Sequence, residues 1–204
     1  MYEVNANIAQ KVIDAVRPGL VKGMGEPIPG QMCVEAAVCF AYGLPHSDNP
    51  PCVGQCVRSL KIALNDSNWN SNESRAKGML RLSVAQLGSD QIDQEEFNKL
   101  VQKMTIQKFL PLILRHVGLN KEADRCEAEG TMVSALAARA AAREAAVHAV
   151  HAAYNAAVHT DFAIHYIASE LGEHILHDFA EEVVQILISM KSPGCEYLYL
   201  TEGN

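Results

Sequence analysis

The chain has 204 residues, of which 49% are hydrophobic, and a formal net charge of −7 at pH 7. This size allows one domain or two small ones with a substantial core, and the acidic balance without a Lys/Arg run argues against a nucleic-acid partner. No basic amino terminus precedes an apolar run, and no apolar segment approaches the roughly 20 residues that span a bilayer, so we expect a cytoplasmic protein without a membrane partner.

Four helices are expected in the first half of the chain, where apolar residues recur at helical spacing between segments rich in Pro and Gly. The second of them is apolar nearly all round, with Glu35 as its one charge, and should be buried. The expected helices cover residues 4–16, 31–43 (opening at Gln31 or Met32), 52–65 and 72–87, and the loops between them cover residues 18–30, 45–51 and 65–72.

The second half of the chain is also expected to be helical. A helix capped by Asp93 should continue to Val117, and Pro111 should kink or divide it because its ring removes a backbone hydrogen bond. A short charged helix or turn follows, and after the alanine-rich stretch a helix either starts at Asp161 or continues the preceding one. These segments cover residues 121–129 and 161–172, and the last helix covers residues 173–190.

The alanine-rich stretch from Thr131 to His159 is the element around which we expect the chain to be organised. Alanine has the highest helix propensity, and the stretch has no Pro or Gly, so it predicts one helix of about 40 Å. One face is nearly all Ala and would let another helix approach closely, a second carries Val and Tyr, and a third carries His148, His151 and His159. Such a helix is central in a bundle and long enough to make an oligomer contact.

These elements predict an all-α fold, a bundle of about seven helices around the Ala-rich helix with a short extended C-terminal tail. We expect a single domain over residues 1–204, with a subdivision near residues 118–130 as the alternative. Residues Cys195 to Leu200 alternate apolar and polar only partly, which fits an extended arm or a short strand. A lone strand needs a partner, most simply another copy of the chain.

A candidate reaction centre begins at Cys33, in the expected first turn of the second helix. The helix dipole there lowers a thiol pKa, and Gln31 can donate to an oxyanion while His46 and Asp48 serve as base and orienter. The arrangement resembles the cysteine at a helix start in papain-like hydrolases, without their Gly-x-Cys-Trp flank. It implies a cysteine-dependent hydrolase or transferase. The alternative is a packed thiol, since the six cysteines fit reduced, buried side chains.

Two sets of side chains have the residue types of metal ligands. The first combines soft donors that suit zinc, namely Cys33 or Cys39, His46, Cys52 and Cys56. The second joins the histidine face of the Ala-rich helix to side chains at helical spacing near the last helix, namely Glu170, His174, His177, Asp178 and Glu181. Packed thiols and solvated polar faces explain both sets, so we expect no metal and no cofactor; a zinc- or di-metal-binding helical protein is the alternative.

Several segments together resemble a group of uncharacterised bacterial and bacteriophage proteins. They are GEPIPGQMCVEAAVCFAYGLPH, NDSNWNSNESRAKGM, the Ala-rich middle and ILISMKSPG. The resemblance covers most of the chain and implies a bacterial or viral cytoplasm, but no activity.

The first functional hypothesis is a non-catalytic helical protein that forms a homo-oligomer through the Ala-rich helix and binds a protein or small-molecule partner through its loops. Three loops are available for this role, over residues 23–31, 45–52 and 65–72. Their candidate ligand-binding residues are Glu26, Gln31, His46, Asn65, Trp69 and Asn72.

Overall fold

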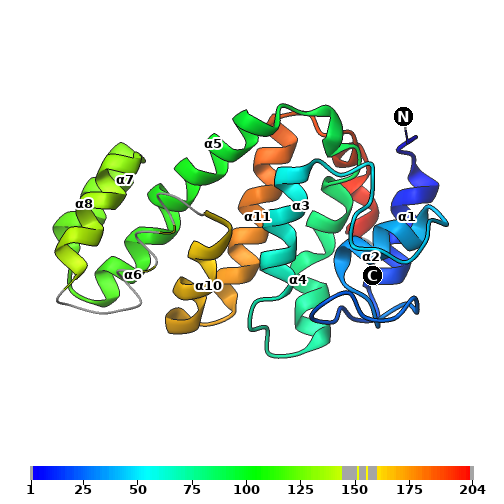
Figure 1. The fold of residues 1–204 in the computed structure, drawn as a ribbon, viewed down its shortest axis with the longest axis horizontal. Coiled ribbons are helices and arrows are strands. Elements are labelled where there is room, and N and C mark those ends of the chain that lie inside the picture. Colours follow the sequence, from blue (N-terminus) through cyan, green and yellow to red (C-terminus); the bar gives the residue numbers. More distant parts are fainter. Residues whose placement is uncertain (1, 144–150, 152–154, 156–159, 203–204) are drawn as a thin grey trace. The chain divides into compact units, whose positions relative to one another are not determined.

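The computed structural model describes residues 2–143, 151, 155 and 160–202 (Figure 1). Within these residues the chain is all-α, with ten α-helices and no strand, which confirms the expected fold class; about seven helices had been expected. The helices are α1 (Ala6–Val16), α2 (Val34–Ala41), α3 (Gln55–Asn65), α4 (Asn72–Ala85), α5 (Gln94–Met104), α6 (Leu110–His116), α7 (Asn120–Glu129), α8 (Met132–Ala142), α10 (Thr160–Leu171) and α11 (His174–Ser189), with the short elements η1 (Ser89–Gln91), η2 (Thr105–Phe109) and η3 (Pro193–Thr201).

The chain divides into two compact units. The first unit contains Met1–Phe97 and Ala180–Asn204, and the second contains Asn98–Phe179. The boundaries therefore fall within α5 and α11, whereas the sequence suggested one domain or a subdivision near residues 118–130. That sequence-based division stays a prediction.

The core of the first unit forms where α1 packs against α2 and α4, and where α2 packs against α3. The inward face of α1 presents Val12, Ile13 and Val16, all without exposed surface. Helix α2, which packs on α1, buries Ala36 and Ala37 fully, and side chains this short allow helices to approach closely. Helix α1 covers most of the expected range 4–16, because Asn5 caps its first turn by accepting a hydrogen bond from Ile8 N at 3.0 Å.

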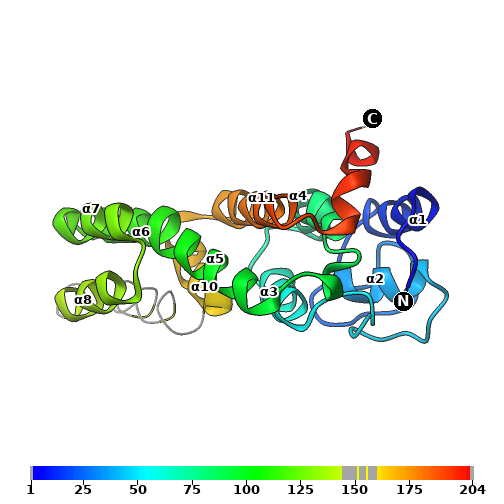
Figure 2. The same ribbon diagram turned by 90° about the horizontal axis from the view of Figure 1, so that it is seen from above.

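The C-terminal segment is a 3₁₀-helix, so the expected extended tail or strand is wrong. Element η3 packs on α4 and on α1 within the first unit, as the red segment in Figures 1 and 2 shows. Gly194 N donates to Leu87 O at 2.7 Å, and Ser192 Oγ donates to Ala85 O at 2.8 Å. The tail thus satisfies carbonyls at the end of α4 in its own molecule. It has no need of a strand partner.

Pro111 divides the helix expected over residues 93–117, as the sequence predicted. The segment is built from α5, the π-helical η2 and α6, and Pro111 lies in the first turn of α6. A Pro has no N–H to donate to the carbonyl four residues before it, which here belongs to Gln107 in η2. The backbone widens where that bond is missing.

The continuous described part of the Ala-rich stretch holds α8, in the second unit, and beyond residue 143 the structure describes His151 and Asn155 alone in this stretch. Helix α8 packs on α7, beside which it runs in Figure 2, and buries Ala135, Ala138 and Ala142. Thr131 caps α8 in a capping box with Ser134. Residues 144–150, 152–154 and 156–159 lie outside the described residues, so a single helix to His159 and its three faces stay a prediction.

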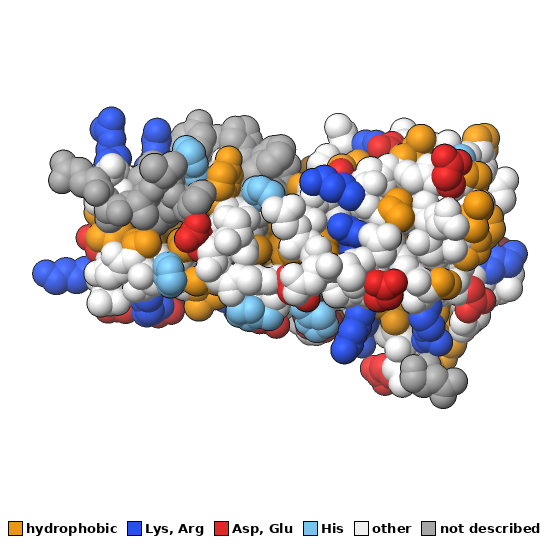
Figure 3. Space-filling model, turned by 90° about the horizontal axis from the view of Figure 1, so that it is seen from below, with side chains coloured by type: hydrophobic (Ala, Val, Ile, Leu, Met, Phe, Trp, Pro, Cys, Tyr) orange, Lys and Arg blue, Asp and Glu red, His pale blue; other side chains and the backbone are white. Residues whose placement is uncertain are grey.

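Charged side chains are spread over the surface. On the face shown in Figure 3, Lys and Arg side chains alternate with Asp and Glu, and neither sign forms a continuous field. No helix in the described ranges has both the length and the apolar character needed to cross a membrane.

Candidate functional site

Three loops of the first unit meet beside the N-terminus of α2 and the C-terminus of α3. His46 Nε2 lies 2.9 Å from Gly25 O, and because a carbonyl can only accept, this nitrogen carries the proton. Gly23 N donates to Asp66 Oδ1 at 2.8 Å. The loop over residues 23–31 is thus tied to both other loops that the sequence singled out, 45–52 and 65–72.

Arg75 of α4 and Asn65 of α3 anchor these loops through hydrogen bonds to backbone groups. The buried guanidinium of Arg75 donates to Leu20 O at 2.8 Å and to Asn65 O at 2.7 Å. The side-chain amide of Asn65 donates to Val21 O at 2.9 Å, and its Oδ1 accepts a long bond of 3.4 Å from Val34 N. Two side chains therefore connect the start of the first loop, the end of α3 and the start of α2.

Gly25 permits the tight turn that the first loop makes before α2. It has φ of 68°, a conformation that favours glycine, and forms an isolated β-bridge with Met32. A Cβ at this position would collide with Gln31 O. Only glycine fits here, and the turn brings the chain back to Cys33 at the start of α2.

Glu35 of α2 and Lys61 of α3 form an ion pair in the core of the first unit. Lys61 Nζ lies 3.1 Å from Glu35 Oε1, and neither side chain has any exposed surface. Beyond this contact, the carboxylate oxygens and the ammonium have no hydrogen-bond partner in the described part of the chain. Burial raises the pKa of Glu35 and lowers that of Lys61, while each partner's charge opposes the shift of the other.

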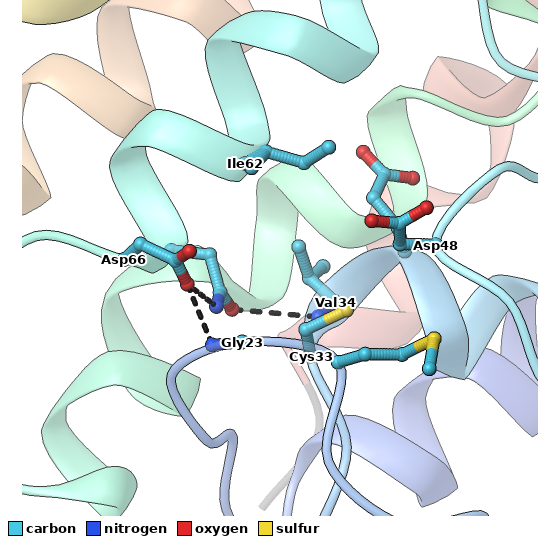
Figure 4. A pocket seen from close by; sticks show the side chains of 9 residues that line it. Gly23, Cys33, Val34, Asp48, Ile62 and Asp66 are labelled. Atoms are coloured by element: carbon cyan, nitrogen blue, oxygen red, sulfur yellow. Dashed lines mark hydrogen bonds between the residues drawn. The ribbon is translucent and has the colours of Figure 1, made fainter.

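A small pocket of about 30 Å³ opens between the three loops, and Glu35 forms part of its wall. Figure 4 shows Cys33, Asp48, Ile62 and Asp66 around this space. Asp48 Oδ1 accepts from Arg58 at 2.8 Å, and Asp66 Oδ1 accepts from Gly23 N. Asp48 and Asp66 therefore line the pocket with one carboxylate oxygen each engaged by a neighbour, whereas the side chain of Glu35 has no exposed surface.

A larger groove of about 540 Å³ also lies in the first unit, between α1 and the end of α2. Its walls are mainly apolar, and its carboxylate, Asp14, accepts a hydrogen bond from Gln10 at 2.8 Å. Among its lining residues there is no buried polar group without a partner. The smaller pocket is lined by Asp48, Asn65 and Asp66, which hydrogen bonds hold in place, and this makes it the better candidate for specific recognition.

Cys33 caps α2 and does not lie in the first helical turn, because the helix begins at Val34 and the expected start at Gln31 or Met32 is wrong. Its Sγ accepts a hydrogen bond from Ala36 N at 3.4 Å. Burial raises the pKa of this thiol, an effect larger than the lowering by the backbone N–H groups of Ala36 and Glu35. The N-terminus of a helix stabilises a solvated thiolate, but at Cys33 the loss of solvation outweighs this effect.

The other three residues of the proposed reaction centre make separate contacts. His46 bonds Gly25 O, Asp48 bonds Arg58, and Gln31 is an exposed turn residue whose O accepts from Glu26 N at 2.7 Å. No hydrogen bond in the described residues joins any of them to Cys33. The nucleophile assignment stays a prediction without support from these contacts.

The remaining predicted ligand-binding residues differ in their roles. Asn65 lines the pocket, whereas Glu26 is exposed on the first loop. Trp69 is buried, donates from Nε1 to Leu64 O at 2.9 Å, and covers Gly78, where a Cβ would meet its ring. Asn72 accepts from Arg75 at 2.8 Å through its side chain. Trp69 and Asn72 therefore position the third loop and do not line the pocket.

Sequence reasoning missed Lys61 and Asp66. Lys61 occupies a place in the apolar stripe of α3, three residues before Leu64 and one after Leu60. A lone Lys in one apolar stripe and a lone Glu in an apolar helix nearby indicate a buried pair, because isolated charges are too costly to bury. Asp66 carried no such signal, since its role depends on a loop distant in sequence.

Metal-binding groups do not gather in the described part of the chain. No set of three His, Cys, Asp or Glu side chains there is placed to hold a metal ion, which includes the proposed zinc set of Cys33 or Cys39, His46, Cys52 and Cys56. His148 and His159 lie outside the described residues, so the di-metal alternative that uses them stays a prediction.

Comparison of the chain with protein-family models, curated proteins and solved structures finds no match. The resemblance to bacterial and bacteriophage proteins therefore stays a prediction. Function has to be inferred from the residues of the site themselves.

The Glu35–Lys61 pair generates a prediction about stability. We expect Lys61→Met or Glu35→Leu alone to lower the free energy of unfolding by about 3–5 kcal/mol at pH 7, because each leaves one buried charge unpaired. The double variant should be at least as stable as the parent, because apolar side chains need no desolvation of charge. Urea unfolding followed by fluorescence of Trp69, the one Trp of the chain, measures this. Additive losses in the double variant would contradict the pairing.

The same variants should depend on pH in opposite directions. In Lys61→Met, the raised pKa of Glu35 means that the folded state binds a proton more readily than the unfolded chain, so stability falls as pH rises above the ordinary value of 4.5. In Glu35→Leu, the lowered pKa of Lys61 means that stability falls as pH drops below the ordinary value of 10.5. Unfolding curves between pH 5 and 9 should therefore slope oppositely. Slopes of the same sign would contradict these shifts.

Cys33 should resist alkylation in the folded protein. It is 5% exposed and its thiol pKa is raised, so little reactive thiolate is present at pH 7.5. Peptide mass mapping after iodoacetamide treatment should find Cys33 unmodified in the native state and modified in urea, with the less buried Cys56 as comparison. Rapid native labelling of Cys33 would instead favour the cysteine-nucleophile alternative.

Proposed function

We propose that this protein is a non-catalytic helical binding protein that takes a small ligand, or a side chain of a protein partner, in the pocket between its three loops. The observation that carries the proposal is the pocket of about 30 Å³ between the loops, in whose lining Asp48 and Asp66 are held in place by Arg58 and by Gly23 N. A small concave site with fixed polar side chains is typical of specific ligand recognition.

The anchoring of the loops supports binding over catalysis. The polar side chains at the pocket are held by Lys61, Arg58 and backbone groups, which preorganises them for recognition. A cysteine-dependent hydrolase or transferase remains the rival hypothesis. It requires a reactive thiolate at Cys33, and burial raises the pKa of that thiol and so disfavours the thiolate. A cytoplasmic location and a bacterial or phage origin remain parts of the proposal.

A pocket-filling variant tests the binding function. We expect saturation-transfer difference NMR with a mixed set of cationic, anionic and neutral fragments to give hits with the full chain. Ile62→Trp, which fills the pocket from α3, should abolish them, whereas Leu112→Trp, at a 39% exposed position of the second unit, should retain them. Hits that survive Ile62→Trp would contradict binding at this pocket.

We also propose self-association through the Ala-rich region. Helix α8 presents the large apolar side chains of Met132, Val133 and Leu136, which are 47%, 67% and 39% exposed and lie within one turn and a half of helix. Exposed apolar surface of this kind favours a covering partner, and a second copy can supply an identical stripe around a two-fold axis. The occupant we propose is therefore another copy of this chain.

Val133→Glu should dissociate this oligomer. The position is the second residue of α8, where the helix dipole favours an acid, so the helix itself should persist. Light scattering should give an oligomer for the parent, a monomer for Val133→Glu, and an oligomer for the control Ile188→Lys, at a 40% exposed position of α11. A monomeric parent across a wide concentration range would refute self-association.

A further inference from the structure

Phe40 is the exposed residue of α2, a helix whose other residues are all buried. It is 44% exposed and lines the groove of about 540 Å³ between α1 and the end of α2. Exposed Pro29 and the half-buried Ile8 and Tyr42 line the same groove. Apolar surface gathered in this way favours binding, because a ligand that covers it removes apolar area from water.

The walls of the groove are held in place within the first unit. Gly30 N, next to Pro29, donates to Ala15 O of α1 at 3.0 Å. The hydroxyl of Tyr42 donates to Glu3 O at 2.9 Å. Binding in the groove therefore does not have to order its walls, which lowers the free-energy cost of binding.

Two opposite charges lie in the lining of this groove. Lys11 and Asp14 are three residues apart on α1, and both are exposed. Asp14 accepts a hydrogen bond from Gln10 at 2.8 Å, but that donor is a neutral amide and leaves the negative charge uncompensated. Within the described residues neither Lys11 nor Asp14 forms an ion pair. The groove thus offers both a cation and an anion to a ligand.

The separation of these charges suits the two ends of a dipeptide. Cβ atoms three residues apart on a helix are about 5–6 Å apart, and two extended residues span at most about 7 Å. A single amino acid carries both charges on one Cα, and a longer extended peptide places its ends further apart. The volume of the groove also lies in the range of roughly 300–1,000 Å³ that is typical of small-ligand sites.

We propose that the groove binds a dipeptide with apolar side chains. Its carboxylate lies at Lys11, its ammonium lies at Asp14, and its side chains cover Phe40. The lining of the groove shares no residue with the pocket between the three loops. The dipeptide site is therefore independent of the proposed function.

Leucyl-phenylalanine and its blocked forms test the assignment. In ¹H–¹⁵N correlation spectra of the full chain, the dipeptide should shift the backbone amides of Ala15, Phe40 and Gly43 saturably, with a Kd on the order of millimolar. The N-acetylated form lacks the ammonium and the amide form lacks the carboxylate. Each should bind about three- to fivefold more weakly, the loss expected for one exposed ion pair. Glycylglycine, which has no apolar side chains, should not bind.

Two results would overturn the assignment. Equal binding of the dipeptide and both blocked forms would remove the role of the two charges. No saturable shift at these three amides with any of the probes would remove the site.

Variants at exposed positions assign each contact. Lys11→Met should bind the dipeptide and its amide equally, and Asp14→Asn should bind the dipeptide and its acetylated form equally, because each variant lacks the charge that the blocked end would meet. Phe40→Ser should weaken binding about tenfold, because it removes apolar surface from the groove. The control Asp66→Asn, in the pocket between the loops, should bind as the parent does. Charge variants that discriminate between the blocked forms as the parent does would overturn the proposal.

Discussion

The first unit depends on one interaction, the ion pair between Glu35 and Lys61. Removing two charges from water costs several kcal/mol for each ion, and only their mutual contact at 3.1 Å offsets this. The pair therefore constrains how α2 and α3 face each other. Lys61 lies one turn before Asn65, and Glu35 lies two residues after Cys33, so the same constraint brings the end of α3 beside the start of α2 and places the pocket between them.

The loops around the pocket are held by groups that sequence reasoning assigned to ligand binding. Asn65 ties the first loop to α3, while Asn72 and Trp69 hold the third loop on α4. Asn65 and Trp69 donate to backbone carbonyls, whereas Asn72 accepts from Arg75. Asp48 and Asp66 in the pocket lining are engaged in the same way, by Arg58 and by Gly23 N, so the positions of the polar groups of the site follow from how the loops are fixed.

Local signals in the sequence predicted most of the described helices. Ser71 caps α4 and Pro111 divides the helix after Asp93, because capping and proline geometry act within a few residues. Features that depend on distant segments were not predictable in this way. The C-terminal 3₁₀-helix forms against the end of α4, and Cys33 becomes a cap and not a helical residue because the preceding turn at Gly25 returns the chain to it. Of the site, Glu35 was noted as a lone charge, but its partner in α3 was hidden within an apolar stripe.

The most direct measurement is a double-mutant cycle on the buried pair, in which urea unfolding at pH 7 compares the parent with Glu35→Leu, Lys61→Met and the double variant. Each single variant leaves one buried charge without its partner, and the double variant leaves none. We expect each single variant to lose about 3–5 kcal/mol of unfolding free energy and the double variant to be at least as stable as the parent. A double variant that loses the sum of the two single losses would contradict the role given to the buried pair.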